Sequence, residues 1–295
     1  MNKLKGILAQ NGIISNLLIL VGISCFFTFL GMIIWTLVST PNATDVDSLK
    51  IMQLIESLGM FVIPPFVLAW FCSDRPTAFL YLDKKINWAH VGMVVLFMLM
   101  IIPAINLLSY INQQMVLPKA FAGVEAWMKA SEEQMAKLTE KLVSVHSLPA
   151  LTFNIFLIAL IPAFGEELFF RGTIQRIFRQ KTSALIAIWI TSVVFSAIHL
   201  QFYGFFPRML LGVFFGYLLF WSENLWLPVV AHFTNNAIAI VFYYLKYNGY
   251  RVPNIDTIGT GGTLWLGFVS VVLGISGFYL LRNLIQKSNA FSVNS

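Results

Sequence analysis

Long apolar stretches alternate with short polar segments along most of this chain. About 20 consecutive apolar residues in a helix cross the hydrocarbon core of a bilayer. Eight stretches come close to or exceed that length, at residues 13–38, 52–72, 88–112, 149–181, 183–200, 207–221, 227–247 and 264–285. The pattern predicts an all-α fold, a polytopic transmembrane helix bundle of about eight spans. Pro64, Pro65 and Pro103 lie inside the second and third spans, where proline is expected to kink a helix.

The segment 113–147, between the third and fourth spans, breaks this pattern because it is long and well charged. Its apolar residues recur at roughly helical spacing, at Val124, Met128, Met135, Leu138, Leu142 and Val145. That spacing is typical of an amphipathic helix. We expect a helix that lies on the bilayer or caps the bundle, with a lid over a functional site as the second interpretation.

Composition places the whole chain in a membrane. Of its 295 residues 58% are hydrophobic and only 11% are charged, and the mean hydropathy is +0.78. So few charges cannot solvate a soluble domain of this size. The net charge of +6 does not indicate nucleic-acid binding, because the basic residues form short clusters between apolar segments. Cys25 and Cys72 each lie in an apolar segment, which fits small buried residues rather than a disulfide.

The distribution of Lys and Arg predicts how the bundle is oriented. With eight spans, the segments on the side of the termini hold Lys3, Lys5, Arg75, Lys84, Lys85, Arg171, Arg176, Arg179, Lys181, Arg282 and Lys287. The short segments on the other side hold only Lys50, Arg208, Lys246 and Arg251. The positive-inside rule then predicts that both termini are cytoplasmic. Short loops without an obvious organelle signal favour a bacterial inner membrane.

Two carboxylates and a guanidinium follow one another at the end of the apolar run 151–164, at Glu166, Glu167 and Arg171. Ionisable groups at membrane depth mark a functional site by default. Glu167 and Arg171 are four residues apart and can pair on one helix face. Glu166 points about 100° away from Glu167 around the helix and stays free.

Two later spans carry the other polar groups of interest. His199 lies one turn after Phe195, and His232 and Asn236 project from one face because they are four residues apart. A lone histidine in a membrane is more often a contact between helices. Two glutamates, two histidines and an asparagine on three helices in one half of the chain favour a shared site instead.

The chemistry open to this set is narrow. No cysteine lies nearby, and Ser196 lacks the sequence setting of a serine nucleophile. A carboxylate with two imidazoles can hold and deprotonate a water molecule, directly or through a divalent metal. An asparagine amide can donate to the oxyanion that forms when water attacks a carbonyl. The residues therefore indicate hydrolysis of an amide or ester inside the membrane.

Three motifs in order, Glu166-Glu167-x-x-x-Arg171, Phe195-x-x-x-His199 and His232-x-x-x-Asn236, resemble the CPBP family of intramembrane proteases. That family comprises the type II CAAX prenyl endopeptidases and the bacteriocin-processing or bacteriocin-immunity proteins, once called the Abi family. The resemblance covers about residues 149–247. It divides the chain into 1–148, with three spans and the amphipathic loop, and 149–295, with the catalytic spans, within one integrated membrane domain.

The resemblance implies a role for each motif residue. Glu166 would be the base that activates water, and His199 would bind or polarise that water or a metal. His232 and Asn236 would supply a further ligand or the oxyanion donors, with Glu167 and Arg171 in support. Glu166, His199 and His232 would be the ligands of a zinc ion if one is used, and a metal-free mechanism stays open. The partners implied are membrane lipid and a membrane-associated peptide or protein substrate.

Two other functions remain open at this point. A non-catalytic membrane scaffold or immunity protein could keep the same fold, and a proton-coupled transporter could also bury Glu, His and Arg. Transporters usually place polar groups in both halves of the chain, whereas the first three spans here hold almost none. The catalytic hypothesis also requires that His199, near the outer end of its span, and His232, near the inner end of another, reach one depth.

Overall fold

A computed structural model describes residues 4–39 and 45–293, with side chains described as far as residue 288. Every regular element within those residues is helical, which confirms the all-α class. Lys3, which entered the orientation argument, lies outside the described residues. The main helices are α1 (Ile13–Val38), α2 (Val46–Glu56), α3 (Ile63–Cys72), α4 (Pro76–Phe79), α5 (Trp88–Met100), α6 (Ile102–Gln113), α7 (Ala122–Val143), α8 (Leu148–Asn154), α9 (Ile161–Glu167), α10 (Arg176–Arg179), α11 (Ala184–Ala197), α12 (Phe205–Ser222), α13 (Trp226–Tyr247) and α14 (Leu264–Val293).

The number of spans is smaller than the eight expected. Within the described residues six helices are long and apolar enough to cross a membrane, and a seventh counts if α5 and α6, bent by 43°, form one span. The bend falls at Ile101, just before Pro103, where the sequence predicted a kink. The stretch expected at 183–200 is the exception. It forms α11, whose 14 residues cover about 21 Å and fall short of the hydrocarbon thickness.

Three π-helical turns interrupt the spans. Two of them, Ser57–Val62 and Ile155–Leu160, end two residues before Pro64 and Pro162. A proline cannot donate to the carbonyl four residues earlier and its ring crowds that carbonyl, so an extra residue in the preceding turn relieves the conflict. The third, η4 (Leu168–Gln175), contains Arg171 and no proline. Turns of this kind are frequent at functional sites.

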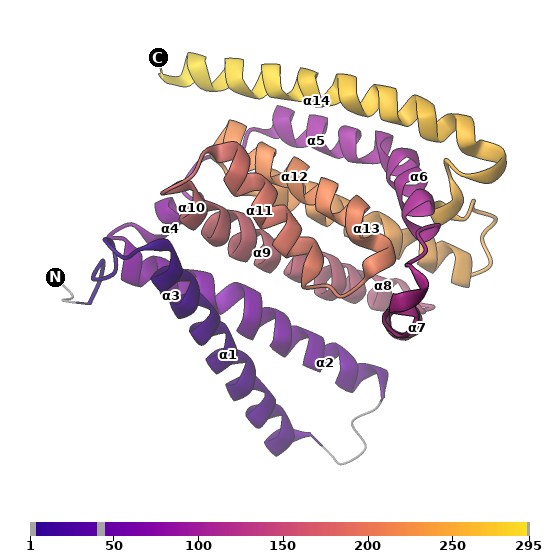
Figure 1. Ribbon diagram of the computed structural model, residues 1–295, viewed down its shortest axis with the longest axis horizontal. Helices are drawn as coiled ribbons and strands as arrows, with labels where there is room; N and C mark the ends of the chain where they lie inside the picture. The colour runs from indigo at the N-terminus through magenta and orange to yellow at the C-terminus, as the bar shows by residue number, and fades with distance from the viewer. Residues whose placement is uncertain (1–3, 40–44, 294–295) are drawn as a thin grey trace.

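The arrangement places α9, α11, α12 and α13 together in the middle of the molecule (Figure 1). Helices α5 and α14 lie along one side of this group, and the hairpin of α1 and α2 splays away on the other. The first and last described residues lie at the same end of the bundle. The first half of the chain therefore supplies helices on both flanks of the second half.

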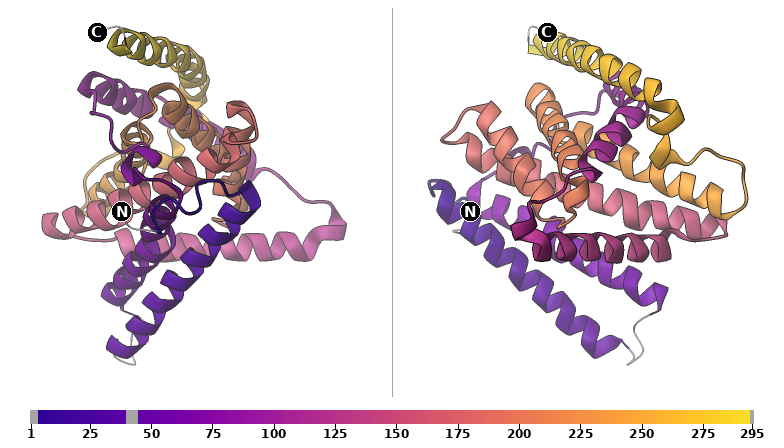
Figure 2. Two further views of the ribbon diagram at one scale, coloured as in Figure 1. Left: turned by 90° about the vertical axis from the view of Figure 1, so that its left-hand side faces the viewer. Right: turned by 45° about the vertical axis from the view of Figure 1, so that its right-hand side comes forward.

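The amphipathic segment forms the helix that its spacing predicted. Figure 1 shows α7 nearly end-on at the edge opposite the termini, and the turned views of Figure 2 show it extending across that end of the bundle. Its contacts hold it there: the Trp127 ring packs on Phe202, with centroids 5.3 Å apart, and Glu140 accepts a hydrogen bond from the hydroxyl of Tyr247 at 2.5 Å. The helix thus packs against protein and covers the bundle at that end.

Candidate active site

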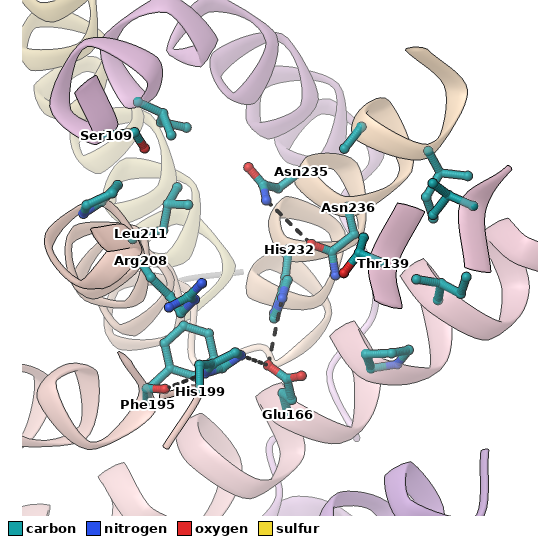
Figure 3. Close-up of a pocket in the computed structure, with 18 of the residues that line it drawn as sticks. Ser109, Thr139, Glu166, Phe195, His199, Arg208, Leu211, His232, Asn235 and Asn236 are labelled. Carbon is teal, nitrogen blue, oxygen red and sulfur yellow. Dashed lines mark hydrogen bonds and ion pairs between the residues drawn. The ribbon is translucent and has the colours of Figure 1, made fainter. Parts of the chain in front are cut away.

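The Glu166 carboxylate is the point on which two histidines converge (Figure 3). It lies on α9, and its Oε2 is 3.8 Å from Nε2 of His199, which follows α11, and 3.9 Å from Nε2 of His232 on α13. Three elements distant in the chain therefore bring one carboxylate oxygen and two imidazole nitrogens close together. Both imidazoles therefore reach one carboxylate, as the catalytic hypothesis requires, and the helix that His199 follows, α11, has only 14 residues.

Glu167 and Arg171 form the ion pair that their spacing predicted, with Nη1 to Oε1 at 2.8 Å. Both side chains are completely buried. Arg171 also donates from Nη2 to the carbonyl of Gly212 at 3.0 Å, and its guanidinium stands 4.5 Å from the centre of the Phe195 ring. An added Cβ at Gly212 would come within 3.0 Å of that Nη2. A larger residue at this position would crowd the arginine where α12 approaches it.

The same Glu167 carboxylate orients one of the histidines. Its Oε1 lies 2.9 Å from Nδ1 of His232, so Nδ1 is the protonated nitrogen, because the paired carboxylate can only accept. Likewise Nδ1 of His199 lies 2.7 Å from the carbonyl oxygen of Phe195 and must donate to it. In the neutral rings both Nε2 atoms are then acceptors, as is the Oε2 of Glu166. Three acceptors facing one another repel unless a proton donor or a cation lies between them.

A cavity of about 480 Å³ adjoins this centre. Its lining runs from His232 to Tyr243 on α13, from Phe215 to Pro207 on α12, and from Glu166 back to Ile158 along the preceding π-turn. In each helix this is the direction toward α7, which adds Thr139 and Val143 to the wall. On the opposite side the buried Arg171 and its aromatic neighbours close the cavity.

Asn236 lines this cavity, one turn beyond His232. Its Oδ1 accepts a hydrogen bond from Nδ2 of Asn235 at 3.4 Å, and Figure 3 shows its amide beside Thr139 on the cavity wall. No hydrogen bond joins Asn236 to Glu166 or to either histidine within the residues the structure describes. All six residues expected at the site are therefore gathered here, with Asn236 on the cavity wall and apart from the ionised core.

A zinc ion was one option left open by the sequence. The chemistry of the donors suits it, since each imidazole donates from Nδ1 and presents a bare Nε2. Their spacing does not, because tetrahedral bonds of 2.0–2.1 Å hold ligand atoms about 3.4 Å apart and here Glu166 is 3.8 and 3.9 Å from the two nitrogens. No group of three His, Cys, Asp or Glu in residues 4–39 and 45–293 is arranged to hold a metal. As placed, these residues do not form a zinc site, and the use of zinc, which the sequence left open beside a metal-free mechanism, is untested.

Sequence reasoning missed several residues of the cavity. The Phe215 ring stacks on His232 with centroids 5.2 Å apart, and Asn235 and Arg208 line the wall. The sequence alone indicates only that Arg208 is a basic residue on the external side. Its position four residues into an otherwise apolar helix was the available signal, since an intramembrane arginine calls for a partner.

Comparisons with known proteins agree with the motifs. Residues 148–238 match the family model described as type II CAAX prenyl endopeptidase Rce1-like. An uncharacterized protein of Bacillus subtilis (strain 168), YpbD, is 27% identical over 120 residues, which cover 39% of this chain and 57% of that protein. No solved structure matches. The resemblance is thus confirmed over a range that contains all six site residues, and at the level of the family it supports a membrane-embedded protease.

Proposed function

We propose that this protein is an intramembrane endopeptidase that hydrolyses a peptide bond of a membrane-associated peptide or protein. The observation that carries the proposal is the convergence of Glu166 Oε2 with two bare Nε2 atoms on the wall of a cavity. A water molecule fits the place between them, because it donates one proton to the carboxylate and one to an imidazole. Its lone pair is then left for an electrophile in the cavity.

Hydrolysis follows from this arrangement in two steps. The water oxygen attacks the carbonyl carbon of the scissile bond while Glu166 takes its proton, and the carbonyl π electrons move onto oxygen. The amide NH₂ of Asn236, which lines the same cavity, would donate to that oxyanion. The oxyanion then collapses, the C–N bond breaks, and the leaving nitrogen takes the proton from Glu166. The products are a carboxylic acid and an amine, and the glutamate is regenerated.

Glu167 and Arg171 support this chemistry without touching the substrate. Both side chains of their ion pair are fully buried, and Glu167 Oε1, which accepts from Arg171, also accepts from Nδ1 of His232 and so fixes the tautomer of that ring. We propose an integral protein of a bacterial inner membrane with both termini cytoplasmic, where lipids surround the bundle and the cavity receives a peptide segment.

Cleavage of quenched-fluorescence peptides in proteoliposomes tests the proposal. We expect wild-type protein to cleave members of an apolar peptide panel, and cleavage in H₂¹⁸O to place ¹⁸O in the new carboxylate. Glu166→Gln and His199→Ala should each reduce kcat by about 10²-fold or more. Glu56→Gln and His90→Ala are matched controls, because these residues lie on α2 and α5 outside the cavity; they should cleave like wild type. Equal cleavage by Glu166→Gln would refute the mechanism, and no cleavage of any peptide would favour the scaffold function.

A further inference from the structure

Arg208 is the one charged group of the cavity wall whose role the proposed chemistry leaves open. It lies on the first turn of α12, half-buried, among residues that line the same cavity as Glu166 and His199. Figure 3 shows its guanidinium beside the His199 ring and directed into the cavity. A substrate held over Glu166 would therefore lie within its reach.

The partners of Arg208 are neutral. Nη1 donates to the backbone carbonyl of Gln201 at 3.4 Å, and Nη2 donates to the side-chain oxygen of the same residue. None of the carboxylates described by the structure forms an ion pair with it. A guanidinium has five N–H donors in a planar fork that matches a carboxylate. Most of this donor capacity is left for something in the cavity.

Arg171 shows what the same fold does with a structural arginine. That side chain is fully buried and has a carboxylate at 2.8 Å, a carbonyl at 3.0 Å and an aromatic ring at 4.5 Å. Arg208 has no such enclosure, although a charge at this depth is costly unless it is paired. Of the two arginines, Arg208 alone faces the cavity, and it alone lacks an anion.

Helix α7 adds to this difference between Arg171 and Arg208. Glu132 on α7 is close enough to act electrostatically on Arg208, yet it forms no ion pair with it, and its Oε2 is buried without a hydrogen-bond partner. Glu166 also acts on Arg208 from the catalytic centre. Both carboxylates stand outside contact distance, so a substrate carboxylate could bind the guanidinium without displacing either.

We propose that Arg208 binds a carboxylate of the substrate close to the scissile bond and so selects peptides that carry one there. This inference rests on the proposed peptidase function. The carboxylate can be the free C-terminus of the peptide or an Asp or Glu side chain, and both present the same two oxygens to the fork.

The test uses three versions of one N-palmitoylated apolar peptide that wild type cleaves. The first has a free C-terminus and no acidic side chain, the second is its C-terminal amide, and the third is the amide with one Asp moved residue by residue along the chain. We expect KM for a carboxylate form to be about 10- to 100-fold lower than for the amide. The first version and the Asp series then distinguish a C-terminal from a side-chain source.

Variants assign the preference to Arg208. Arg208→Gln should raise KM for the carboxylate form by about 10- to 100-fold, keep kcat within about threefold, and leave the amide unchanged. Arg208→Lys should restore part of the preference through its charge. Arg179→Gln, a matched control on α10 outside the cavity, should shift nothing. Equal losses on acid and amide peptides, or no preference in wild type, would overturn the proposal.

Binding measurements separate this proposal from the peptidase function. Anisotropy of the labelled peptides is measured with Glu166→Gln protein in nanodiscs, with and without Arg208→Gln. Tighter binding of the acid form that disappears with Arg208→Gln supports the role of Arg208 even if wild type cleaves nothing. Cleavage that depends on Glu166 but ignores the carboxylate retains the peptidase and rejects the assignment of Arg208. Equal binding of acid and amide forms, or no binding of the acid form, also rejects it.

Discussion

The ion pair of Glu167 and Arg171 supports the sharpest stability prediction. Replacing Arg171 with Met removes a guanidinium with no exposed surface, whose partner carboxylate also has none. Glu167 would then keep only its contact with Nδ1 of His232. A buried charge that loses its partner costs about 3–5 kcal/mol. At roughly 2–4 °C per kcal/mol, the apparent Tm should fall by about 6–20 °C.

A double variant shows whether the loss comes from the stranded charge. In Glu167→Gln with Arg171→Met no charge remains, and the Gln oxygen can still accept from His232 Nδ1. We expect this protein to lie within about 2 kcal/mol of wild type, since uncharged replacement of a buried pair is often close to neutral. The exposed Arg251 supplies a control, because Arg251→Met should change stability by less than about 0.5 kcal/mol.

The assay is thermal unfolding in detergent, followed by the fluorescence of the 8 tryptophans at one fixed scan rate. Arg171→Met should melt well below wild type, with the double variant between them and closer to wild type. Equal melting of Arg171→Met and wild type would show that the pair contributes little. A double variant as unstable as the single one would show that lost packing, and not the unpaired carboxylate, is the cause.

Further outcomes follow from single side chains. Asn236→Ala should lower kcat about 10²- to 10³-fold and change KM little in the peptide assay. A change in KM alone would show that Asn236 does not stabilise the oxyanion. Gly212→Ala places a Cβ 3.0 Å from Arg171 Nη2 and should cost about 1–3 kcal/mol, whereas Gly92→Ala meets nothing within 4 Å and should be neutral in the same melts. Cleavage should persist when the chelator 1,10-phenanthroline is added. A loss of cleavage that added zinc restores would show that the protein is a metal enzyme. Burial raises the pKa of Glu132 above its ordinary value, so the folded state holds this proton more tightly. Stability should therefore fall as the pH rises from about 4.3 through the raised pKa, and Glu132→Gln should flatten that part of the unfolding profile.

Much of the local structure was readable from the chain because a membrane leaves few choices. Backbone groups in hydrocarbon must bond within their own segment, so each long apolar stretch had to be helical. The bend near Pro103, the helix at 122–143 and the pairing of Glu167 with Arg171 each depend on neighbours a few residues apart. Such contacts follow from the repeat of the helix alone.

The position of α11 was not readable in this way. Its sequence is as apolar as that of a span, and nothing in the pattern marks that the helix ends at Ala197. That ending places His199 against Glu166. The tautomer of His232 likewise depends on a carboxylate from another helix.

The sequence by itself predicted the helices, the location in a membrane and the set of polar residues that the structure gathers. Only the tertiary structure decided that Glu166 meets both histidines, that the cavity opens toward α7, and that Arg208 faces it without an anion. The physical reason is the range of the interactions. Helical periodicity is a property of neighbouring residues, whereas distances between helices depend on tilt, length and close approach at residues such as Gly212, which the whole packed bundle sets together.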